Sequence, residues 1–364
     1  MSKIHELHHK LYTPTPVHIY AIVVPSLQPQ HLHPQARLQW KRCADIPVEM
    51  ENAQAVVLGE KIYVGGGETR ENHVVFQYDL PRDGWSRLPP HPVRYFAMAQ
   101  FRGHLITVGG KGAQRGVDIT GKVYLFKEES QVWVEFLKPM PTARYQLSAA
   151  TTQSFIIASG GVTGEVDGKD VLCPTVEVYS IETFQWYTAA PLPAPYAFRS
   201  SVTIADGCYL LGGHVKDYLD MTTILYASLT SIIAKATSPI ATHQSASNTS
   251  VWKILPVTPL KGSAAASLSG NLIAVGGYKG NTSIPGLAVR ALAMLAGATM
   301  PVQPTLHTFL SFTNSWVKIK TGDLPEPRVS CTAVQLSPNT MIVIDGFDSQ
   351  VKSTNTVFTG TITV

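Results

Sequence analysis

The chain contains Ile62-Tyr63-Val64-Gly65-Gly66, then Tyr78-Asp79, then Trp85, and this order recurs along its length. Its six tryptophans are Trp40, Trp85, Trp133, Trp186, Trp252 and Trp316. A glycine mark follows each one, at Gly65-Gly66, Gly109-Gly110, Gly160-Gly161, Gly212-Gly213, Gly276-Gly277 and Asp345-Gly346. The first five intervals from tryptophan to mark span 24 to 27 residues, and the sixth, to Asp345, spans 29. Self-similarity at a near-fixed spacing predicts an array of similar structural units.

The second unit shows the internal plan most clearly. Residues 95–101 form a first predicted strand, Arg102-Gly103 a tight turn and residues 104–108 a second strand that ends at the glycine pair. A polar loop over 111–121 leads to a third strand over 122–126, and a fourth carries Trp133. Four short antiparallel strands separated by turn signals are typical of one blade of a β-propeller.

An aromatic residue seven positions before tryptophan sets the register of the third and fourth strands. It is Tyr78, Phe126, Tyr179 or Phe309 in four of the units. The fourth unit departs from this spacing because an insertion delays Trp252, and we expect Tyr226 to be its third-strand aromatic.

A strand ending in a double glycine, followed by an aromatic and a tryptophan at set spacing, resembles the kelch repeat. The resemblance covers about residues 36–364 and implies an all-β, six-bladed kelch-type propeller with four-stranded antiparallel blades. The expected blades are about 51–90, 93–138, 143–191, 197–256, 261–320, and 328–364 together with 36–46. We expect residues 1–35 to be a poorly ordered tail or linker. The departures are Asp345-Gly346 in blade six and insertions in blades four and five.

The two ends of the chain predict how the ring closes. Blade six runs out after its third strand without a tryptophan, whereas Trp40 has no preceding blade. Residues 36–46 should therefore supply the outer strand of blade six, which removes an exposed edge.

Two insertions lie outside the repeat. Residues 234–250 between the third and fourth strands of blade four are rich in Ser, Thr and Ala, which predicts a mobile loop. Residues 287–295 in blade five contain good helix formers and predict a short helix, either packed on the rim or used for docking a partner.

Polar residues open the predicted first strands. They are Glu51, Arg94, Arg144, Arg199, Lys261 and Arg328. Repeat symmetry predicts that these five cations and one carboxylate surround one end of the propeller axis, where they would attract anions. The structural alternative is that the arginines bind loop carbonyls and acidic side chains within the fold.

In partner-binding kelch proteins the residue after this position commonly faces the ligand, together with the loop after the double glycine. By that resemblance the followers are Asn52, Tyr95, Tyr145, Ser200, Gly262 and Val329. The loops add Arg70, Asn72, Arg115 and Tyr278, whereas Glu165, Asp167 and Asp170 make the blade-three loop acidic. The expected partner-binding set is Asn52, Arg70, Asn72, Arg94, Tyr95, Arg115, Arg144, Tyr145, Arg199, Ser200, Tyr278 and Arg328. Tyr and Arg concentrate binding energy at protein interfaces.

The resemblance favours a non-catalytic adaptor or scaffold that binds a protein partner, as a substrate receptor or cytoskeletal binder. The alternative is an enzyme or binder of small anionic ligands such as sialic-acid-type sugars at the central funnel, with Glu51, Arg94, Arg144 and Arg199 as its polar groups. If those arginines are buried in contacts with carbonyls, that alternative loses its site.

The remaining features exclude other classes. A net charge of +4 without a basic run disfavours nucleic-acid binding. No apolar run is long enough to span a membrane, and we expect a cytoplasmic monomer. The four cysteines lack metal-ligand spacing and read as buried thiols. His5-Glu6-Leu7-His8-His9 matches a zinc-protease motif but lies in the expected tail, so we expect no cofactor and no metal.

Overall fold

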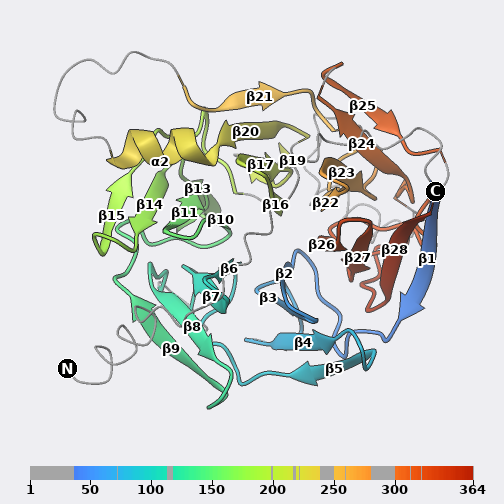
Figure 1. The fold of residues 1–364 in the computed structure, drawn as a ribbon, viewed down its shortest axis with the longest axis horizontal. Coiled ribbons are helices and arrows are strands. Elements are labelled where there is room, and N and C mark those ends of the chain that lie inside the picture. The colour runs from blue at the N-terminus through green and yellow to red at the C-terminus, as the bar shows by residue number, and fades with distance from the viewer. Residues whose placement is uncertain are drawn as a thin grey trace, which may run out of the picture.

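A computed structural model describes residues 37–71, 73–112, 118–197, 200–215, 219–220, 222–237, 250–258, 260–279, 300–311, 313–320 and 322–363. Six four-stranded antiparallel sheets are arranged around a common axis, as Figure 1 shows. The predicted six-bladed, all-β propeller is therefore confirmed. The first strands of neighbouring blades contact one another around that axis, and the fourth strands lie at the rim.

The strands follow the chain from blade to blade. Blade one contains β2 (Gln54–Leu58), β3 (Lys61–Gly65), β4 (Val75–Asp79) and β5 (Gly84–Arg87), and blade two contains β6 (Ala97–Phe101), β7 (His104–Val108), β8 (Val123–Lys127) and β9 (Val132–Leu137). Blade three contains β10 (Ser148–Thr151), β11 (Phe155–Ser159), β14 (Val176–Ser180) and β15 (Gln185–Thr188), and blade four contains β16 (Ser200–Ile204), β17 (Gly207–Leu211), β20 (Ile224–Ser228) and β21 (Lys253–Leu255). Blade five contains β22 (Ala264–Leu268), β23 (Asn271–Val275), β24 (Leu306–Leu310) and β25 (Ser315–Lys318), and blade six contains β26 (Thr332–Ser337), β27 (Thr340–Ile344), β28 (Val357–Thr363) and β1 (Arg37–Cys43).

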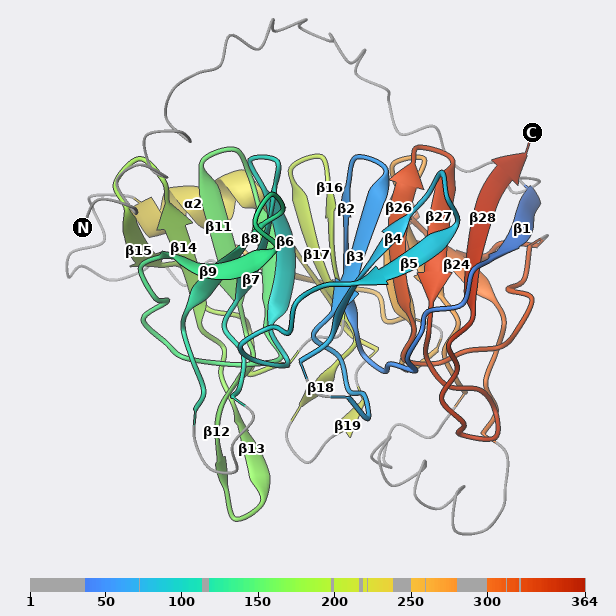
Figure 2. The same cartoon turned by 90° about the horizontal axis from the view of Figure 1, so that it is seen from below.

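Two small hairpins lie between second and third strands. They are β12 (Val162–Val166) with β13 (Lys169–Leu172), and β18 (His214–Val215) with β19 (Leu219–Asp220). Both project from the same face of the ring, as the side view in Figure 2 shows. We call this the loop face, because it also contains the segments that follow the glycine pairs.

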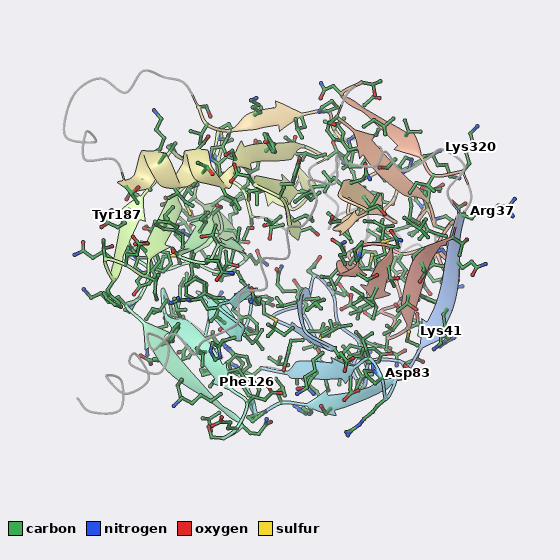
Figure 3. The ribbon with its side chains drawn as sticks, in the orientation of Figure 1. Arg37, Lys41, Asp83, Phe126, Tyr187 and Lys320 are labelled. Carbon is green, nitrogen blue, oxygen red and sulfur yellow. The ribbon has the colours of Figure 1, made fainter. Side chains whose placement is uncertain are left out.

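The ring closes as the sequence predicts. β1 pairs with β28 over its whole length, from Arg37 opposite Thr363 to Cys43 opposite Val357. Asp83 fixes the junction with blade one: its carboxylate accepts a hydrogen bond from the Ala44 amide at 2.7 Å and another from the Tyr78 hydroxyl at 2.5 Å. Figure 3 shows Asp83 near the end of β1. The Ala44 bond, with the Tyr78 bond, lowers the pKa of Asp83.

The hydrophobic core lies between blades. Each of the six junctions between neighbouring blades contains a cluster of buried side chains contributed by both. The second strands are buried along almost their whole length, whereas fourth strands such as β5 and β25 end exposed. Burial on both sheet faces explains why the second strands read as continuous apolar runs.

The tryptophans connect adjacent blades by hydrogen bonds as well as by packing. Each indole N–H donates to a backbone carbonyl in the segment that links two blades. The acceptors are Gly322 for Trp40, Ala44 for Trp85, Pro89 for Trp133, Lys138 for Trp186, Ala190 for Trp252 and Pro256 for Trp316. The repeat therefore encodes a hydrogen bond between adjacent blades at each junction.

Backbone conformation and close packing explain the double glycine. Gly109 and Gly110 have φ angles of 67° and 120°, where L side chains are strained. A Cβ on Gly109 would lie 2.4 Å from the carbonyl oxygen of Arg144 in the next blade. Close approach of blades at this point thus requires glycine. Blade six places Asp345, with φ 57°, at the corresponding position.

Blade four differs from the sequence prediction. Residues 229–237 form α2 (Leu229–Thr237), so the predicted loop over 234–250 begins with helix. Asp206 Oδ1 accepts from the Thr230 amide at 3.0 Å and caps the helix. The buried face of α2 packs in the same cluster as Trp252. Tyr226 lies in the third strand, as predicted. Residues 238–249 and the predicted helix at 287–295 lie outside the described residues.

Candidate functional site

The polar residues that open the first strands do not form one ring, and backbone hydrogen bonds show why. The second glycine of a blade donates to a carbonyl of the next blade. The acceptors are Arg144 for Gly110, Tyr196 for Gly161, Arg328 for Gly277 and Met50 for Gly346. We call these four residues the linker position.

In blades one, three and six the residue that follows the linker position bridges to a residue just after the glycines, which in blade one extend to Gly67. In blades two and five, Arg94 and Lys261 make the equivalent bridge. These bridges join Glu51 to Glu68, Arg94 to Lys111, Tyr145 to Val162, Lys261 to Tyr278 and Val329 to Phe347. We call Glu51, Arg94, Tyr145, Lys261 and Val329 the bridge position. Arg144 and Arg328 therefore lie one residue earlier than Glu51, Arg94 and Lys261, and the predicted ring of equivalent charges is corrected. The prediction aligned residues by chemical type, whereas the backbone register separates them.

Arg144 is a buried structural group. Its side chain is fully buried, and Nη1 pairs with Glu177 Oε2 at 2.9 Å. Nη2 donates to the Ala158 carbonyl at 3.1 Å, and Thr142 Oγ1 donates to Glu177 Oε1 at 2.8 Å. Arg144 thus fastens the linker to the second and third strands of blade three.

Arg328 has the same role in blade six. It is fully buried and donates from Nη1 to the Asp345 carbonyl at 3.0 Å. Its Nη2 pairs with Glu326 at 2.5 Å, and it also contacts Thr354. Neither Arg144 nor Arg328 offers side-chain surface to a ligand. For Arg144 this removes one cation from the site that a sugar acid would need at the funnel.

Blade two holds its linker with a neutral histidine instead. His91 is buried, with Nε2 at 2.8 Å from Thr107 Oγ1 and Nδ1 at 2.8 Å from the Val93 carbonyl oxygen. The Val93 amide also donates to Nδ1 at 3.1 Å, so both ring nitrogens have hydrogen-bond partners within the fold. Burial lowers the pKa of His91 to about 3. In blade two it is thus His91, and not an arginine, that fastens the linker.

The residues after the bridge position turn around the propeller axis. Asn52, Tyr95, Gln146, Gly262 and Ser330 all have φ between 51° and 65°. The Gln146 amide donates to the Tyr95 carbonyl at 2.9 Å, and the Ser330 amide donates to the Gly262 carbonyl at 3.0 Å. Gln146 was missed because the sequence placed Tyr145 at this point. An apolar residue followed by proline would have given the correct register. The linker residue lies four positions after that apolar residue, as Met50 does after Ile46 and Arg144 does after Met140.

Cations and tyrosines gather over blades two and three on the loop face. The guanidinium of Arg94 lies 5.1 Å from the centre of the Tyr95 ring, and Lys111 Nζ lies 5.0 Å from the Tyr145 ring. The two tyrosine rings are 6.0 Å apart. Arg94 and Tyr95 are half-buried, whereas Tyr145 is buried. Burial, with the Glu68 carboxylate, raises the pKa of Tyr95.

A small hollow opens beside this cluster. It lies between blades one and two, and its lining includes Glu68, His73, Arg94, Tyr95 and Phe96. His73 Nδ1 lies 2.7 Å from the His91 carbonyl oxygen and donates to it. The hollow thus combines both charges with aromatic surface, a composition suited to a polar side chain of a partner.

The β12–β13 hairpin continues this surface over blade three. The Tyr145 hydroxyl donates to Asp170 Oδ1 at 2.8 Å, and the Tyr145 and Val162 backbones exchange two hydrogen bonds. Tyr145 therefore positions the hairpin from below. Sequence analysis assigned the segment to an acidic loop, although Asp167-Gly168 between two short apolar-containing runs is a hairpin signal.

The other predicted site residues are scattered. Arg70 is exposed on the loop after the first glycine mark, and Ser200 is half-buried at the start of β16. Tyr278 is buried in a cluster with Val302, Val329 and Phe347. Asn72, Arg115 and Arg199 lie outside the described residues. Of the predicted set, the structure brings together Arg94, Tyr95 and Tyr145.

Other site types gain no support. Within the described residues, no group of three or more His, Cys, Asp or Glu side chains could hold a metal ion. All four cysteines are free and buried, as predicted. No helix in the described part of the chain is both long and apolar enough to cross a membrane. The histidine motif at residues 5–9 lies outside the described residues.

Comparisons with known proteins agree with the repeat. No protein-family model matches the chain. Its relatives include the kelch-like protein terF of Aspergillus terreus, 26% identical over 188 residues, which are 49% of this chain and 40% of the relative. Kelch repeat and BTB domain-containing protein 12 of Danio rerio is 28% identical over 204 residues, with 50% of this chain and 32% of the relative covered. Beta-scruin of Limulus polyphemus is 26% identical over 151 residues, with coverages of 39% and 16%.

The chain thus spans less than half the length of each of these relatives. Among solved structures, that of YjhT superposes with a TM-score of 0.64 at 16% identity, covering 86% of this chain and 95% of YjhT. At that identity the likeness concerns the fold alone.

Proposed function

We propose that this chain, a member of the kelch-repeat β-propeller family, is a non-catalytic scaffold that binds a segment of another protein on its loop face. The observation that carries the proposal is the cluster of Arg94, Tyr95, Lys111 and Tyr145 beside a hollow between blades. Half-buried tyrosine and arginine next to a concave surface are the features of an interface hot spot. Relatives named as kelch-like and kelch-repeat proteins support the same class.

The two faces of the ring differ in a way that favours this location. On the loop face, the β12–β13 and β18–β19 hairpins project (Figure 2). Backbone hydrogen bonds such as that from Gln146 to Tyr95 join neighbouring blades there. The opposite face carries short turns such as Arg102-Gly103 between β6 and β7. Loops supported by a rigid framework are where binding residues concentrate. The proposal therefore places the partner over blades one to three of the loop face.

Affinity capture with matched variants tests the proposal. The intact chain should retain a protein partner from the native lysate, and Arg94→Ala combined with Tyr95→Asn should lose it. Asparagine suits the positive φ of Tyr95, and blade one carries Asn52 at the same position. The control is Lys127→Ala with Glu129→Ala near the opposite face, which should retain the partner.

Equal retention by all three proteins would contradict the location. No retention by the intact chain, with strong thermal stabilisation by a sugar acid, would contradict the protein-binding function itself.

A further inference from the structure

We propose that the outer edge of β12 accepts an extended segment of a partner protein as an added β-strand, and that this segment alternates apolar and basic residues. The inference rests on the proposed function and specifies what binds there. It starts from the ladder of the β12–β13 hairpin, which has two strands within the described residues.

The edge of β12 already has the beginning of a third strand. Tyr145 donates its amide to the Val162 carbonyl at 3.0 Å and accepts from the Val162 amide at 2.8 Å. Beyond Val162, within the described chain, the sheet that contains Thr163–Val166 has β13 alone as its second strand. A strand with one uncovered edge is a template for main-chain pairing. A two-stranded hairpin is also marginal in water by itself, so a third strand would stabilise it.

One face of the hairpin carries two exposed valines, with Lys169 opposite one of them. Gly164 pairs with Val171, and Val166 lies two residues further along the same strand, so the three share a face. Val166 is 62% exposed and Val171 is 40% exposed. A Cβ on Gly164 would meet no atom within 4 Å. Apolar side chains of an added strand would therefore find partly exposed valines to cover.

The opposite face carries paired acids. Glu165 lies directly across from Asp170 in the ladder. Glu165 is exposed, so a basic side chain on an added strand would lie next to its carboxylate and could pair with it. Because strand side chains alternate between faces, the partner segment should alternate between apolar and basic residues.

The test uses the full chain and a capped six-residue peptide of strictly alternating Lys and Val as probe. Amide hydrogen exchange should slow at residues 163–166 with saturable dependence on peptide concentration. A peptide of the same composition in two blocks, an alternating Glu and Val peptide, and the Lys–Val peptide with N-methylated amides on one edge should all fail. Failure of the methylated peptide identifies main-chain pairing, and failure of the other two identifies the side-chain pattern.

Two variants in the hairpin sharpen the result. Glu165→Gln should weaken binding of the Lys–Val peptide about threefold, since it removes a single favourable pair. Gly164→Val should strengthen binding about threefold, because it adds an apolar side chain where the structure has room. Asp170 is left intact because it holds Tyr145.

Slowed exchange at 163–166 with the alternating Lys–Val peptide alone supports the inference. No slowing, slowing elsewhere, or equal slowing by the methylated peptide overturns it. If the peptide fails while Arg94→Ala with Tyr95→Asn still abolishes capture of a partner, the edge-strand inference falls and the proposed function stands. If the peptide binds at 163–166 and capture is unaffected by that variant, the interaction at β12 stands without the Arg94 cluster.

Discussion

Blades two and three open with the same dipeptide, Arg94-Tyr95 and Arg144-Tyr145, yet the structure uses the two arginines differently. Arg144 lies at the linker position, fully buried against Glu177. Arg94 lies at the bridge position, half-buried against the Tyr95 ring on the loop face. Blade two fastens its linker with neutral His91, whereas blade three uses Arg144. A shift of one residue along the repeat thus exchanges a structural group for a candidate binding group.

The largest effect should come from Arg144→Leu. The substitution leaves Glu177 buried without its counter-ion and should lower the free energy of unfolding by about 3–5 kcal/mol. Denaturant unfolding monitored by tryptophan fluorescence measures the change. Arg144→Leu combined with Glu177→Leu should recover part of the loss, because no uncompensated charge is left. An unchanged midpoint in the single variant would show that the pair does not hold the linker.

Blade two should respond to acid at its histidine anchor. His91 has its pKa lowered from 6.5 to about 3, so below pH 6.5 the unfolded chain binds a proton that the folded chain does not. The contribution of His91 is therefore complete above pH 6.5 and decreases as pH falls toward 3. Lowering the pH from 6.5 to 5 should reduce the free energy of unfolding by about 2 kcal/mol through this residue. Unfolding free energies of the native chain and His91→Gln, measured across this range, should differ in slope; parallel curves would contradict the assignment.

In blade six, by contrast, a substitution should raise the free energy of unfolding. Asp345 occupies a glycine position with φ 57° and is fully buried. Asp345→Gly should raise the free energy of unfolding by about 1–2 kcal/mol by removing backbone strain. Burial also raises the pKa of Asp345 well above its ordinary 3.8, so the native chain should lose stability as pH rises above that value. The advantage of the variant should therefore grow with pH before levelling off. A lower melting temperature for the variant at neutral pH would show that the carboxyl supports the fold.

The smallest effect on stability should come from Arg94→Ala. A half-buried arginine outside the anchor should contribute less than about 1 kcal/mol to folding. Thermal unfolding of this variant should thus follow the native chain closely while partner binding falls. If instead Arg94→Ala destabilises as much as Arg144→Leu, the distinction between the two arginines fails.

The fold could be predicted from the sequence because each blade has the same packing and hydrogen-bonding requirements, which leave the same residues at the same spacing. The tryptophans recur because each junction between blades has the same indole hydrogen bond, and the split blade follows from closing the ring once. The candidate site was harder to predict than the fold. The repeat locates the strands, but it does not show which polar residue lies at the linker position. Tyr145 and Tyr278 were expected to face a partner, whereas both are buried. The β12–β13 hairpin belongs to one blade, and no repeat could indicate its projection.

Site-specific photocrosslinking in the native cell tests the central claim most directly. A photoreactive phenylalanine analogue in place of Tyr95 puts the probe on the loop face, and the same analogue in place of Glu129 puts it at a turn between β8 and β9. We predict that a discrete protein is crosslinked from position 95 and not from position 129. Crosslinking of a partner from position 129 with none from position 95 would contradict the claim that this propeller binds through its loop face.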